Sequence, residues 1–460
     1  MIHCYKFGGY NIVLDIASGS IHSVDDVAYD VIHLFEPADG GDGRDELITQ
    51  VMEMHPRVSR GDVSDVIADI EMLINRGKLF SPDTFADVAE ARREVSLKAL
   101  CMNVSHLCNM YCSYCFAERG EYGGGGGLME LETAKKAIDF LVLNSSGRKT
   151  LDVDFFGGEP LLNWEVVKDT VKYAREVTQR SGKRFRFTLT TNALLIDDDV
   201  IDFTNKEIHN VVLSLDGRPE VHDATRKLPN GDGSYSAVTE NIKKLVDARR
   251  GKGYYIRGTF TRENMDFVND ILHLADLGYK ELSMEPVVTK HGEPYGFTRD
   301  DLPELCRQYE MLAVEMHRRE MLGGGFTFYH YILDLAGGPC LHKRLAGCGV
   351  ATEYLAVTPR GELFPCHQFV GDARFFMGDV WRGIVNNKLR DSFSGCNIYS
   401  QSECRDCWAR FYCSGGCAAN AYYATGSISG VYELGCELFK KRIECAIMLQ
   451  VAKNTKWRLA

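Results

Sequence analysis

The segment Cys108-Asn109-Met110-Tyr111-Cys112-Ser113-Tyr114-Cys115 places three cysteines within eight residues, in the spacing C-x3-C-x2-C. Three thiolates in such a loop can each ligate one iron of a four-iron, four-sulfur cube, because soft sulfur ligands suit iron–sulfur clusters. The fourth iron then has no protein ligand and is free to bind a small molecule. The alternative is a structural zinc site, which needs four closed ligands, with His106 as the nearest candidate for the fourth. The spacing therefore predicts a metal centre and favours a cluster over zinc.

The composition of the 460-residue chain is that of an ordinary globular protein, with 45% hydrophobic and 25% charged residues. Its length predicts two or three domains. The net charge of -11 argues against nucleic acid as a partner, since phosphate binding needs a basic surface. The sequence shows neither a signal-peptide pattern nor an apolar run of membrane-spanning length. We therefore expect a cytoplasmic protein with no nucleic-acid or membrane partner.

The 16 cysteines are distributed unevenly along the chain. None lies between Cys115 and Cys306, whereas ten lie from Cys340 to Cys445. A disulfide framework usually belongs to a small secreted domain, which this long chain does not resemble. The clustering therefore favours ligation of metals or clusters by free thiols.

The N-terminal region, residues 1–90, predicts three short strands followed by three helices. The strands are expected at 3–7, 11–16 and 20–24, and the helices at 27–35, 47–54 and 63–74. Leu79 and Phe80 are expected to return to a strand, and residues 83–94 to form a charged helical linker. This order resembles a small winged helix-turn-helix. DNA binding is the usual function of that pattern, but the acidic residues along these helices speak against it.

The middle region, residues 95–310, alternates apolar β-type runs with helical patterns. Strands are expected at 97–104, 151–156, 185–190, 211–215, 255–260 and 282–285, and helices at 131–143, 164–177, 242–248 and 268–277. Such alternation predicts a parallel sheet with right-handed crossovers, and six strands are too few for a closed eight-stranded barrel. We therefore expect an α/β fold, a partial (β/α)6 TIM-like barrel. Its site should lie at the C-terminal strand ends, where the cysteine loop follows the first strand.

Polar motifs follow the later strands in the same way. Gly157-Gly158-Glu159-Pro160 follows the second strand, Asn192 the third, and Ser214-Leu215-Asp216-Gly217 the fourth, with Arg226 shortly after. Alone, a Gly-Gly-Glu-Pro segment is most often just a turn. Taken in this order, together with C-x3-C-x2-C and Tyr114 before the last cysteine, these motifs resemble the radical S-adenosylmethionine superfamily.

This resemblance implies roles for those residues. Cys108, Cys112 and Cys115 hold a [4Fe-4S] cluster whose unique iron binds the amino and carboxylate groups of S-adenosylmethionine. Glu159 pairs with the methionyl ammonium, and the remaining cofactor-binding residues are Tyr114, Gly157, Gly158, Asn192, Ser214, Asp216 and Arg226. One electron, from a donor such as flavodoxin or ferredoxin, cleaves the sulfonium to a 5′-deoxyadenosyl radical, while the protein orients the reaction. No residue suggests itself as a general base.

The C-terminal region, residues 311–460, begins within a helix expected at 302–321 and holds most of the cysteines. Gly361 precedes Cys366 in a Gly-x4-Cys spacing, and Cys404-x2-Cys407-x5-Cys413-x3-Cys417 follows. A pair of zinc ribbons is the alternative. The set resembles the SPASM extension of the superfamily, which carries two auxiliary [4Fe-4S] clusters. The resemblance assigns one cluster to Cys404, Cys407, Cys413 and Cys436, and the other to Cys348, Cys366 and Cys417.

Cys340 is the candidate for the fourth ligand of the second of these sets, and the sequence leaves open whether it closes that cluster. An open iron would bind the thiolate of a substrate cysteine and lower its pKa. Cys306 is expected in the core, and Cys396 and Cys445 are expected to be structural or free. Residues 123–127 are expected to form a flexible glycine loop beside the cluster, either a linker or a lid over the substrate.

Segments around Cys348 and Cys366 resemble the maturases of Cys-rich peptides with six cysteines in forty-five residues. They are Gly347-Cys348-Gly349, 354–359 and 365–371. The resemblance implies intramolecular thioether formation between a peptide cysteine and an acceptor carbon. It also implies that the N-terminal region binds a leader peptide by adding a strand to its sheet.

Two alternatives remain. An anaerobic sulfatase-maturing enzyme, which makes formylglycine, has an acidic residue directly after the cysteine that corresponds to Cys366, where this chain has His367. Such an enzyme also needs no N-terminal domain. The other alternative is a non-catalytic scaffold that uses clusters only for structure or redox sensing. The intact turn at Gly157 to Pro160 argues against it.

Overall fold

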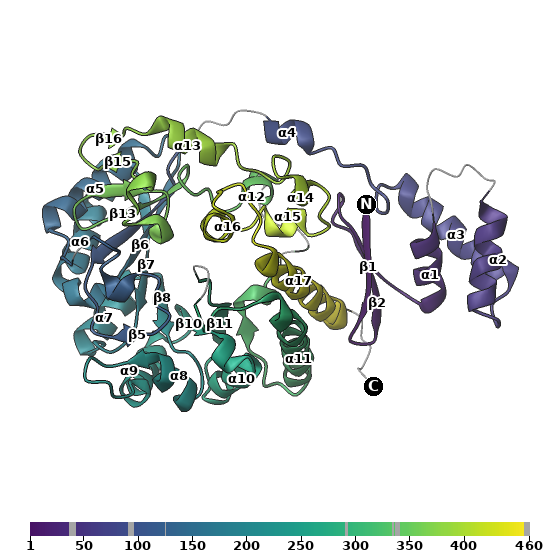
Figure 1. The fold of residues 1–460 in the computed structure, drawn as a ribbon, viewed down its shortest axis with the longest axis horizontal. Helices are drawn as coiled ribbons and strands as arrows, with labels where there is room; N and C mark the ends of the chain where they lie inside the picture. The colour runs from purple at the N-terminus through teal and green to yellow at the C-terminus, as the bar shows by residue number, and fades with distance from the viewer. Residues whose placement is uncertain are drawn as a thin grey trace.

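The computed structural model describes residues 1–35, 43–90, 96–124, 126–289, 293–333, 335 and 341–454. Its largest element is an eleven-stranded sheet in the order β12-β11-β10-β8-β7-β6-β4-β13-β14-β15-β16. Helices lie along the outer side of this curved sheet (Figure 1), and the N-terminal region projects at one end of the molecule. In the described part of the chain, no helix combines the length and apolar character that crossing a bilayer requires.

Six parallel strands form the centre of the sheet, and they confirm the expected partial barrel. They are β4 Ala99–Ser105, β6 Thr150–Gly157, β7 Arg184–Thr191, β8 Asn210–Ser214, β10 Gly253–Phe260 and β11 Glu281–Pro286. The crossover helices are α5 Leu131–Leu143, α6 Trp164–Ser181, α7 Asp198–Glu207, α9 Tyr235–Arg249, α10 Phe267–Asp276 and α11 Leu302–Met321. The helix α7 and the short α8 Pro219–Thr225 were not expected from the sequence. Three aspartates open α7, with the Asp197 side chain accepting a hydrogen bond from Val200 N, and its apolar residues are few.

The two faces of this sheet differ sharply. One face packs against the helices: Arg175 of α6 lies 5.0 Å from the ring of Phe187, and the rings of Phe260 and Phe267 (α10) lie 4.1 Å apart. The strand residues between these apolar positions project from the concave face, and many are polar. On β7, for example, Arg186 pairs with Asp152 of β6 at 2.7 Å. A parallel sheet is usually apolar on both faces, so the polar concave face indicates a lumen that admits water and ligands.

The C-terminal region extends this sheet at both edges, which the sequence analysis did not anticipate. β12 Thr327–Phe328 pairs parallel with β11, and β13 Tyr354–Val357 pairs parallel with β4. Three antiparallel strands then follow β13, namely β14 Glu362–Phe364, β15 Gly378–Asp379 and β16 Gly383–Ile384. These strands are short, and β13 lies far from β4 in the sequence, so no local pattern indicates the pairing.

The N-terminal region is a three-stranded antiparallel sheet followed by three helices. The elements are β1 Ile2–Phe7, β2 Tyr10–Asp15, β3 Ile21–Val24, α1 Asp26–Leu34, α2 Arg44–Met54 and α3 Arg60–Asn75. Val13 of β2 packs in a small separate core, whereas Ile12 and Leu14 join the main core. The strand expected at Leu79 and Phe80 is wrong, because Phe80 adopts the left-handed backbone region with φ 51°. The N-terminal sheet is therefore anchored to the rest of the molecule.

The remaining helices belong mainly to the cysteine-rich region. They are α4 Ala86–Glu90, α12 Leu341–Ala346, α13 Asn387–Ser394, α14 Ser402–Arg405, α15 Arg410–Cys413, α16 Ala418–Thr425 and α17 Glu433–Asn454. α17 packs between α11 and the N-terminal strand β1 (Figure 1), where His3 Nε2 lies 3.0 Å from Glu444 Oε1. Its apolar residues are spread around the helix because neighbours surround it, so it lacks the single apolar stripe by which a sequence reveals a helix.

Candidate cluster and cofactor site

The cysteine loop is held at the C-terminal end of β4 by a second, smaller sheet. β5 Tyr111–Cys112 pairs antiparallel with β9 Arg226–Lys227, and Cys112 lies opposite Arg226. Ser113 N donates to Thr225 O at 2.9 Å. Cys112 and Cys115 lie close enough to Cys108 to raise the pKa of its thiol, and Cys115 likewise acts on the pKa of Cys112. The structure thus brings the three predicted cluster ligands together.

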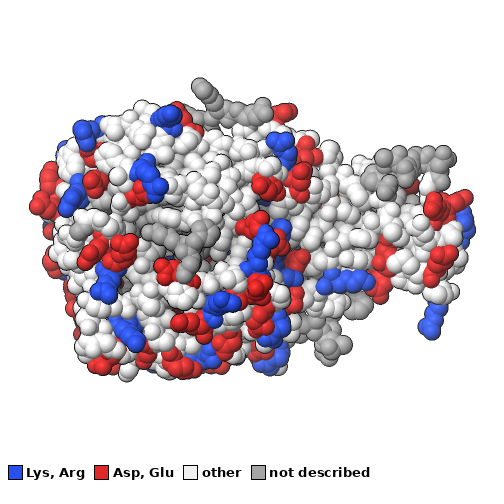
Figure 2. Space-filling view, in the orientation of Figure 1, with Lys and Arg blue, Asp and Glu red and all other residues white. Residues whose placement is uncertain are grey.

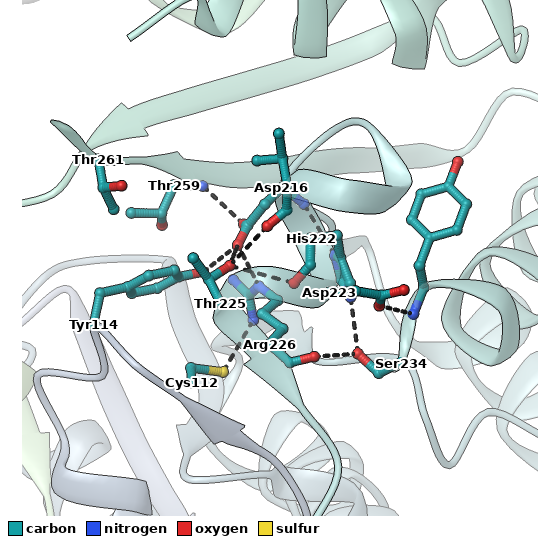
Figure 3. A network of polar contacts seen from close by, with 12 residues as sticks. Cys112, Tyr114, Asp216, His222, Asp223, Thr225, Arg226, Ser234, Thr259 and Thr261 are labelled. Carbon is teal, nitrogen blue, oxygen red and sulfur yellow. Dashed lines mark hydrogen bonds and ion pairs between the residues drawn. The ribbon is translucent and has the colours of Figure 1, made fainter. Parts of the chain in front are cut away.

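A buried carboxylate organises the polar groups behind this loop (Figure 3). Asp216 is fully buried and accepts hydrogen bonds from Tyr114 Oη at 2.5 Å, Arg226 Nε at 2.9 Å, Thr225 Oγ1 at 3.2 Å and Thr259 N at 2.9 Å. Burial alone would raise the pKa of Asp216, but the Arg226 guanidinium lowers it below its usual value. The pair is therefore ionised, and it fixes Tyr114 and Arg226 relative to the loop.

Two donors from later strand ends point at the loop sulfurs. Arg226 Nη1 lies 3.8 Å from Cys112 Sγ, and Asn192 Nδ2 lies 3.8 Å from Cys108 Sγ. Asn192 Nδ2 also donates to Asn109 Oδ1 at 2.7 Å. The Asn109 Nδ2 group is buried and finds no hydrogen-bond partner within the described ranges. Donors directed at sulfur stabilise thiolate ligands, and an orphaned donor beside them fits a further acceptor at this place.

The Gly157-Gly158 turn packs directly on the backbone of the cysteine loop. A Cβ on Gly157 would lie 2.2 Å from Ser105 O, and one on Gly158 would lie 2.3 Å from Leu107 O. Gly157 also has φ 132°, which side chains rarely adopt. Gly158 N donates to Ser105 O at 2.8 Å. Both glycines are therefore needed to bring the turn onto the loop, whatever they contribute to cofactor binding.

Glu159 follows this turn with its side chain completely buried. Its carboxylate accepts hydrogen bonds from Leu161 N at 3.0 Å, Thr191 Oγ1 at 2.7 Å and Asn192 N at 2.8 Å. Burial raises the pKa of Glu159 to about 7 in spite of these bonds. A bound cation would lower that pKa and hold the carboxylate ionised. The Glu159 carboxylate thus lies where the expected partner of an ammonium group should be. Its three hydrogen bonds already occupy most of the acceptor sites of its oxygens.

The cysteines of the C-terminal region fall into two groups. In one group, Cys404, Cys407 and Cys436 each influence the pKa of Cys413. In the other, Cys348 and Cys417 influence the pKa of Cys366. Cys340 lies outside the described residues. The structure therefore brings together the two expected ligand sets, apart from Cys340.

The spacing of these thiols bears on the zinc alternative. Among the residues that the structure describes, no group of three or more His, Cys, Asp or Glu side chains is placed to hold one metal ion. A structural zinc gathers four ligands on a single ion. The cysteines of a four-iron cube bind different irons, so they lie farther apart. Within the described residues, none of the three cysteine groups is thus placed to hold one zinc ion through closed protein ligands.

The structure adds polar residues that no sequence pattern indicated. Tyr122 Oη donates to Gly157 O at 3.1 Å, beside the loop. His330 lies 3.1 Å from Glu285 on the concave face. His367, singled out as a replacement for an acid, lies between the rings of Phe116 and Phe156 at 5.7 and 5.1 Å. Burial lowers the pKa of His367 to about 4, so its imidazole is neutral near pH 7.

A cavity of about 480 Å³ opens beside the cysteine loop. Its walls come from the loop, including Tyr114 and Cys115, and from the region after Cys366, including Gln368 and Gly371. Gly123 of the glycine loop also lines it. The cavity therefore connects the three-thiol loop of the barrel with the cysteine-rich region.

Comparisons with known proteins agree with this geometry. Residues 102–275 match the Radical SAM superfamily. The radical SAM cyclopropyl synthase TigE of Paramaledivibacter caminithermalis is 22% identical over 374 residues, which cover 75% of this chain and 72% of TigE. A cysteine-type anaerobic sulfatase-maturating enzyme of Clostridium novyi is 22% identical over 384 residues, covering 79% and 99%.

Two further matches extend the comparison. The Bacillus subtilis subtilosin biosynthesis protein AlbA is 26% identical over 302 residues, covering 62% of this chain and 59% of AlbA. Among solved structures, native anSMEcpe with bound AdoMet superimposes with a TM-score of 0.64 at 21% identity, covering 78% of this chain and all of that one. This superposition shows that the two chains share a fold.

Proposed function

The chain contains a radical S-adenosylmethionine domain, and from this we propose that it is a peptide maturase that forms intramolecular thioether crosslinks. The substrate is a ribosomally made Cys-rich peptide, in which a cysteine sulfur joins an acceptor carbon. The observation that carries the proposal is the cavity of about 480 Å³ between the three-thiol loop and the region after Cys366. A peptide in this cavity would contact Cys115 of the loop on one side and the segment that follows Cys366 on the other. The anSMEcpe structure with bound AdoMet and Cp18Cys peptide supports a peptide as the class of substrate.

Three [4Fe-4S] clusters and S-adenosylmethionine are the proposed cofactors. Cys108, Cys112 and Cys115 would hold the first cluster, and the two C-terminal cysteine groups would hold the others as a SPASM-type extension. When bound and reduced by an electron donor such as flavodoxin or ferredoxin, the first cluster and S-adenosylmethionine supply a 5′-deoxyadenosyl radical. Glu159, Asn192, Ser214 and Arg226 would orient the cofactor from the strand ends.

The residues of the chain hold this site rigid. The Asp216–Arg226 pair fixes the guanidinium 3.8 Å from Cys112 Sγ without needing the cofactor to position it. His367 is half-buried and its pKa is lowered to about 4, so a neutral imidazole stands where the sulfatase-maturing enzymes have a carboxylate. Tyr122, the Gly157-Gly158 turn and Gly371 close around the loop, since a Cβ on Gly371 would lie 1.7 Å from Tyr122 O.

Formylglycine formation in a sulfatase is the second candidate, because the whole anSMEcpe chain superimposes on this protein. The neutral His367, in place of an acidic residue, argues against it. So does the N-terminal region, which lies close to α17 and offers a second binding surface. Acidic and basic residues are interspersed on the face shown in Figure 2.

We infer that the leader of the substrate pairs with the free edge of β3. Asp15 N donates to Ser20 O at 2.9 Å, and hydrogen-bonded pairs alternate along antiparallel strands. Val13–His22 and Asn11–Val24 are then the bonded pairs of β2 and β3. The backbone groups of Ile21 and Ser23 point outward, where an extended peptide can add a strand.

Mass spectrometry after anaerobic reaction tests the proposal. The reconstituted enzyme, S-adenosylmethionine, a reductant and a candidate Cys-rich peptide should yield 5′-deoxyadenosine and a peptide lighter by two hydrogen atoms for each bridge. The loss should survive reduction and alkylation, which separates a thioether from a disulfide. A product that reacts with hydrazides as an aldehyde, with no crosslink, would instead establish formylglycine formation.

A further inference from the structure

Arg257 projects from the concave face of the sheet, next to the candidate cofactor site. On β10, Phe260 packs on Phe267 of α10, so Ile256 and Gly258 face the helices and Arg257 faces the lumen. In register, Arg257 lies beside Ser214 of β8 and Ser283 of β11. Two residues farther along the strand, Thr259 N donates to Asp216. Arg257 is therefore two residues away, along β10, from the backbone group that contacts Asp216, the carboxylate that organises the cysteine loop.

The guanidinium of Arg257 is unpaired in the part of the chain that the structure describes, unlike those of Arg186 and Arg226. Within the described ranges, its exposed side chain makes neither a hydrogen bond nor an ion pair. By contrast, Arg186 pairs with Asp152 at 2.7 Å, and Arg226 pairs with Asp216 at 2.9 Å. An arginine left unpaired beside a reaction site is available for a ligand.

The groups that face Arg257 leave one positive charge uncompensated. Glu285 Oε1 lies 3.1 Å from His330 Nε2, and Glu285 Oε2 lies 4.0 Å from Arg442 Nη1. Arg442 Nη1 also lies 3.0 Å from His330 Nδ1. His330, Arg257 and Arg442 together hold the pKa of Glu285 well below its usual range. Both ring nitrogens of His330 are engaged, and burial lowers its pKa.

His367 also lies near Arg257, and its imidazole supplies no negative charge. One carboxylate thus faces two guanidinium groups. The Glu285 side chain is 30% exposed and His330 12% exposed, so the cluster borders accessible space. The local charge is positive in a chain whose net charge is -11. An anion is therefore the ligand that this part of the lumen favours.

We propose that Arg257 binds a carboxylate of the substrate peptide and thereby selects a peptide with an acidic residue at the modified position. The inference rests on the proposed peptide-modifying function. A planar guanidinium binds a carboxylate through two parallel hydrogen bonds, which fixes its orientation as well as its position. A carboxylate held at Arg257 lies beside Ser214, so the neighbouring carbon of the peptide faces the cofactor site. The carboxylate comes either from an Asp or Glu side chain or from the C-terminus of the peptide.

Peptide binding tests the proposal with the cluster-loaded protein. The probes are synthetic Cys-containing peptides that differ only in Glu, Gln or Lys at the acceptor position, and a C-terminal amide of the Glu peptide. Anaerobic fluorescence anisotropy gives each Kd without turnover. The protein variants are Arg257→Gln, Arg257→Lys and Arg257→Glu. Arg186→Gln is the matched control, because it removes a paired arginine from the same face of the sheet.

The wild type should bind the Glu peptide at least about tenfold more tightly than the Gln peptide, as expected for a charged hydrogen bond. Arg257→Gln should abolish this preference, Arg257→Lys should keep part of it, and Arg257→Glu should favour the Lys peptide. Arg186→Gln should discriminate as the wild type does. If the amide peptide alone loses affinity, the C-terminus is the bound carboxylate and the selection of an acidic side chain is wrong.

Two results would overturn the inference while leaving the proposed function intact. One is unchanged discrimination between Glu and Gln peptides in Arg257→Gln. The other is a loss of peptide-independent 5′-deoxyadenosine formation in that variant, which would assign Arg257 to the carboxylate of S-adenosylmethionine. Failure of the wild type to form 5′-deoxyadenosine or to modify any peptide would instead overturn the proposed function.

Discussion

The cysteine loop of the barrel and the cysteine groups of the C-terminal region assemble thiols in different ways. The loop supplies three thiols, and Arg226 and Asn192 approach two of the sulfurs at 3.8 Å. The group around Cys413 supplies four thiols, from α14, the segment between α14 and α15, α15 and α17, and Cys404 Sγ lies 3.0 Å from Gln401 Oε1. The first site has fewer ligands and more polar donors than the second.

This difference indicates that the two kinds of site have different functions, namely ligand binding and electron transfer. A cube held by three thiolates has an iron left for a ligand, and the donors of the strand ends lie where that ligand would bind. A cube held by four thiolates is closed, so its use is to accept or donate electrons. The ion pair behind the loop is buried and specific, which suits a site that must orient a cofactor.

Loss of a loop thiol should have the largest effect. Cys112→Ala should abolish 5′-deoxyadenosine formation and lower the iron content by about four per chain. Cys413→Ala should also lose iron, but it should keep peptide-independent 5′-deoxyadenosine formation while losing crosslinked peptide. Iron analysis measures the iron content, and chromatography of the anaerobic reaction measures 5′-deoxyadenosine and crosslinked peptide. Cys306→Ala, on the barrel helix α11, is the control and should resemble the wild type. Turnover retained in Cys112→Ala would remove the distinction between the two sites.

The buried ion pair should contribute more to stability than any surface pair. Asp216→Asn leaves Arg226 buried without its counter-ion, and it should destabilise the protein by about 3–5 kcal/mol. Asp247→Asn removes an exposed pair with Lys243 and should cost at most about 1 kcal/mol. Urea unfolding of the two variants and the wild type compares them. Equal urea midpoints for Asp216→Asn and Asp247→Asn would mean that the stability of the cysteine loop does not depend on the Asp216–Arg226 pair.

The smallest effect should come from the edge of the N-terminal sheet. Ser23→Pro removes an outward backbone N–H without breaking the β2–β3 ladder, so leader affinity should fall roughly 3- to 10-fold. Ser23→Ala keeps that N–H and should bind as the wild type does. Peptide-independent 5′-deoxyadenosine formation should be the same in both. Unchanged affinity in Ser23→Pro would place the leader elsewhere.

Much of the barrel was predictable because its strands and helices carry strong local patterns. The helices α5 and α11 begin and end where their periodicity predicts, at Leu131–Leu143 and Leu302–Met321. α17 has apolar residues on all sides, so its sequence lacks a stripe. The β13–β4 pairing depends on a distant tertiary contact, which no local pattern encodes.

The candidate site was predictable in its residues but not in its contacts. The C-x3-C-x2-C spacing and the strand-end motifs identified the loop, Glu159, Asn192 and Asp216. The approach of Arg226 to Cys112 joins residues 114 positions apart, and sequence alone does not show it. Whether the charge of Arg257 is paired depends on which residues face it across the lumen, and only the structure shows those residues.

Electron paramagnetic resonance of the reduced protein tests the central claim most directly. Adding S-adenosylmethionine should change the signal of one cluster only, and that signal should be missing from Cys108→Ala. The signals of the auxiliary clusters should remain and should not respond. A response to S-adenosylmethionine in Cys108→Ala, or tight zinc binding in place of iron and sulfide, would contradict the account.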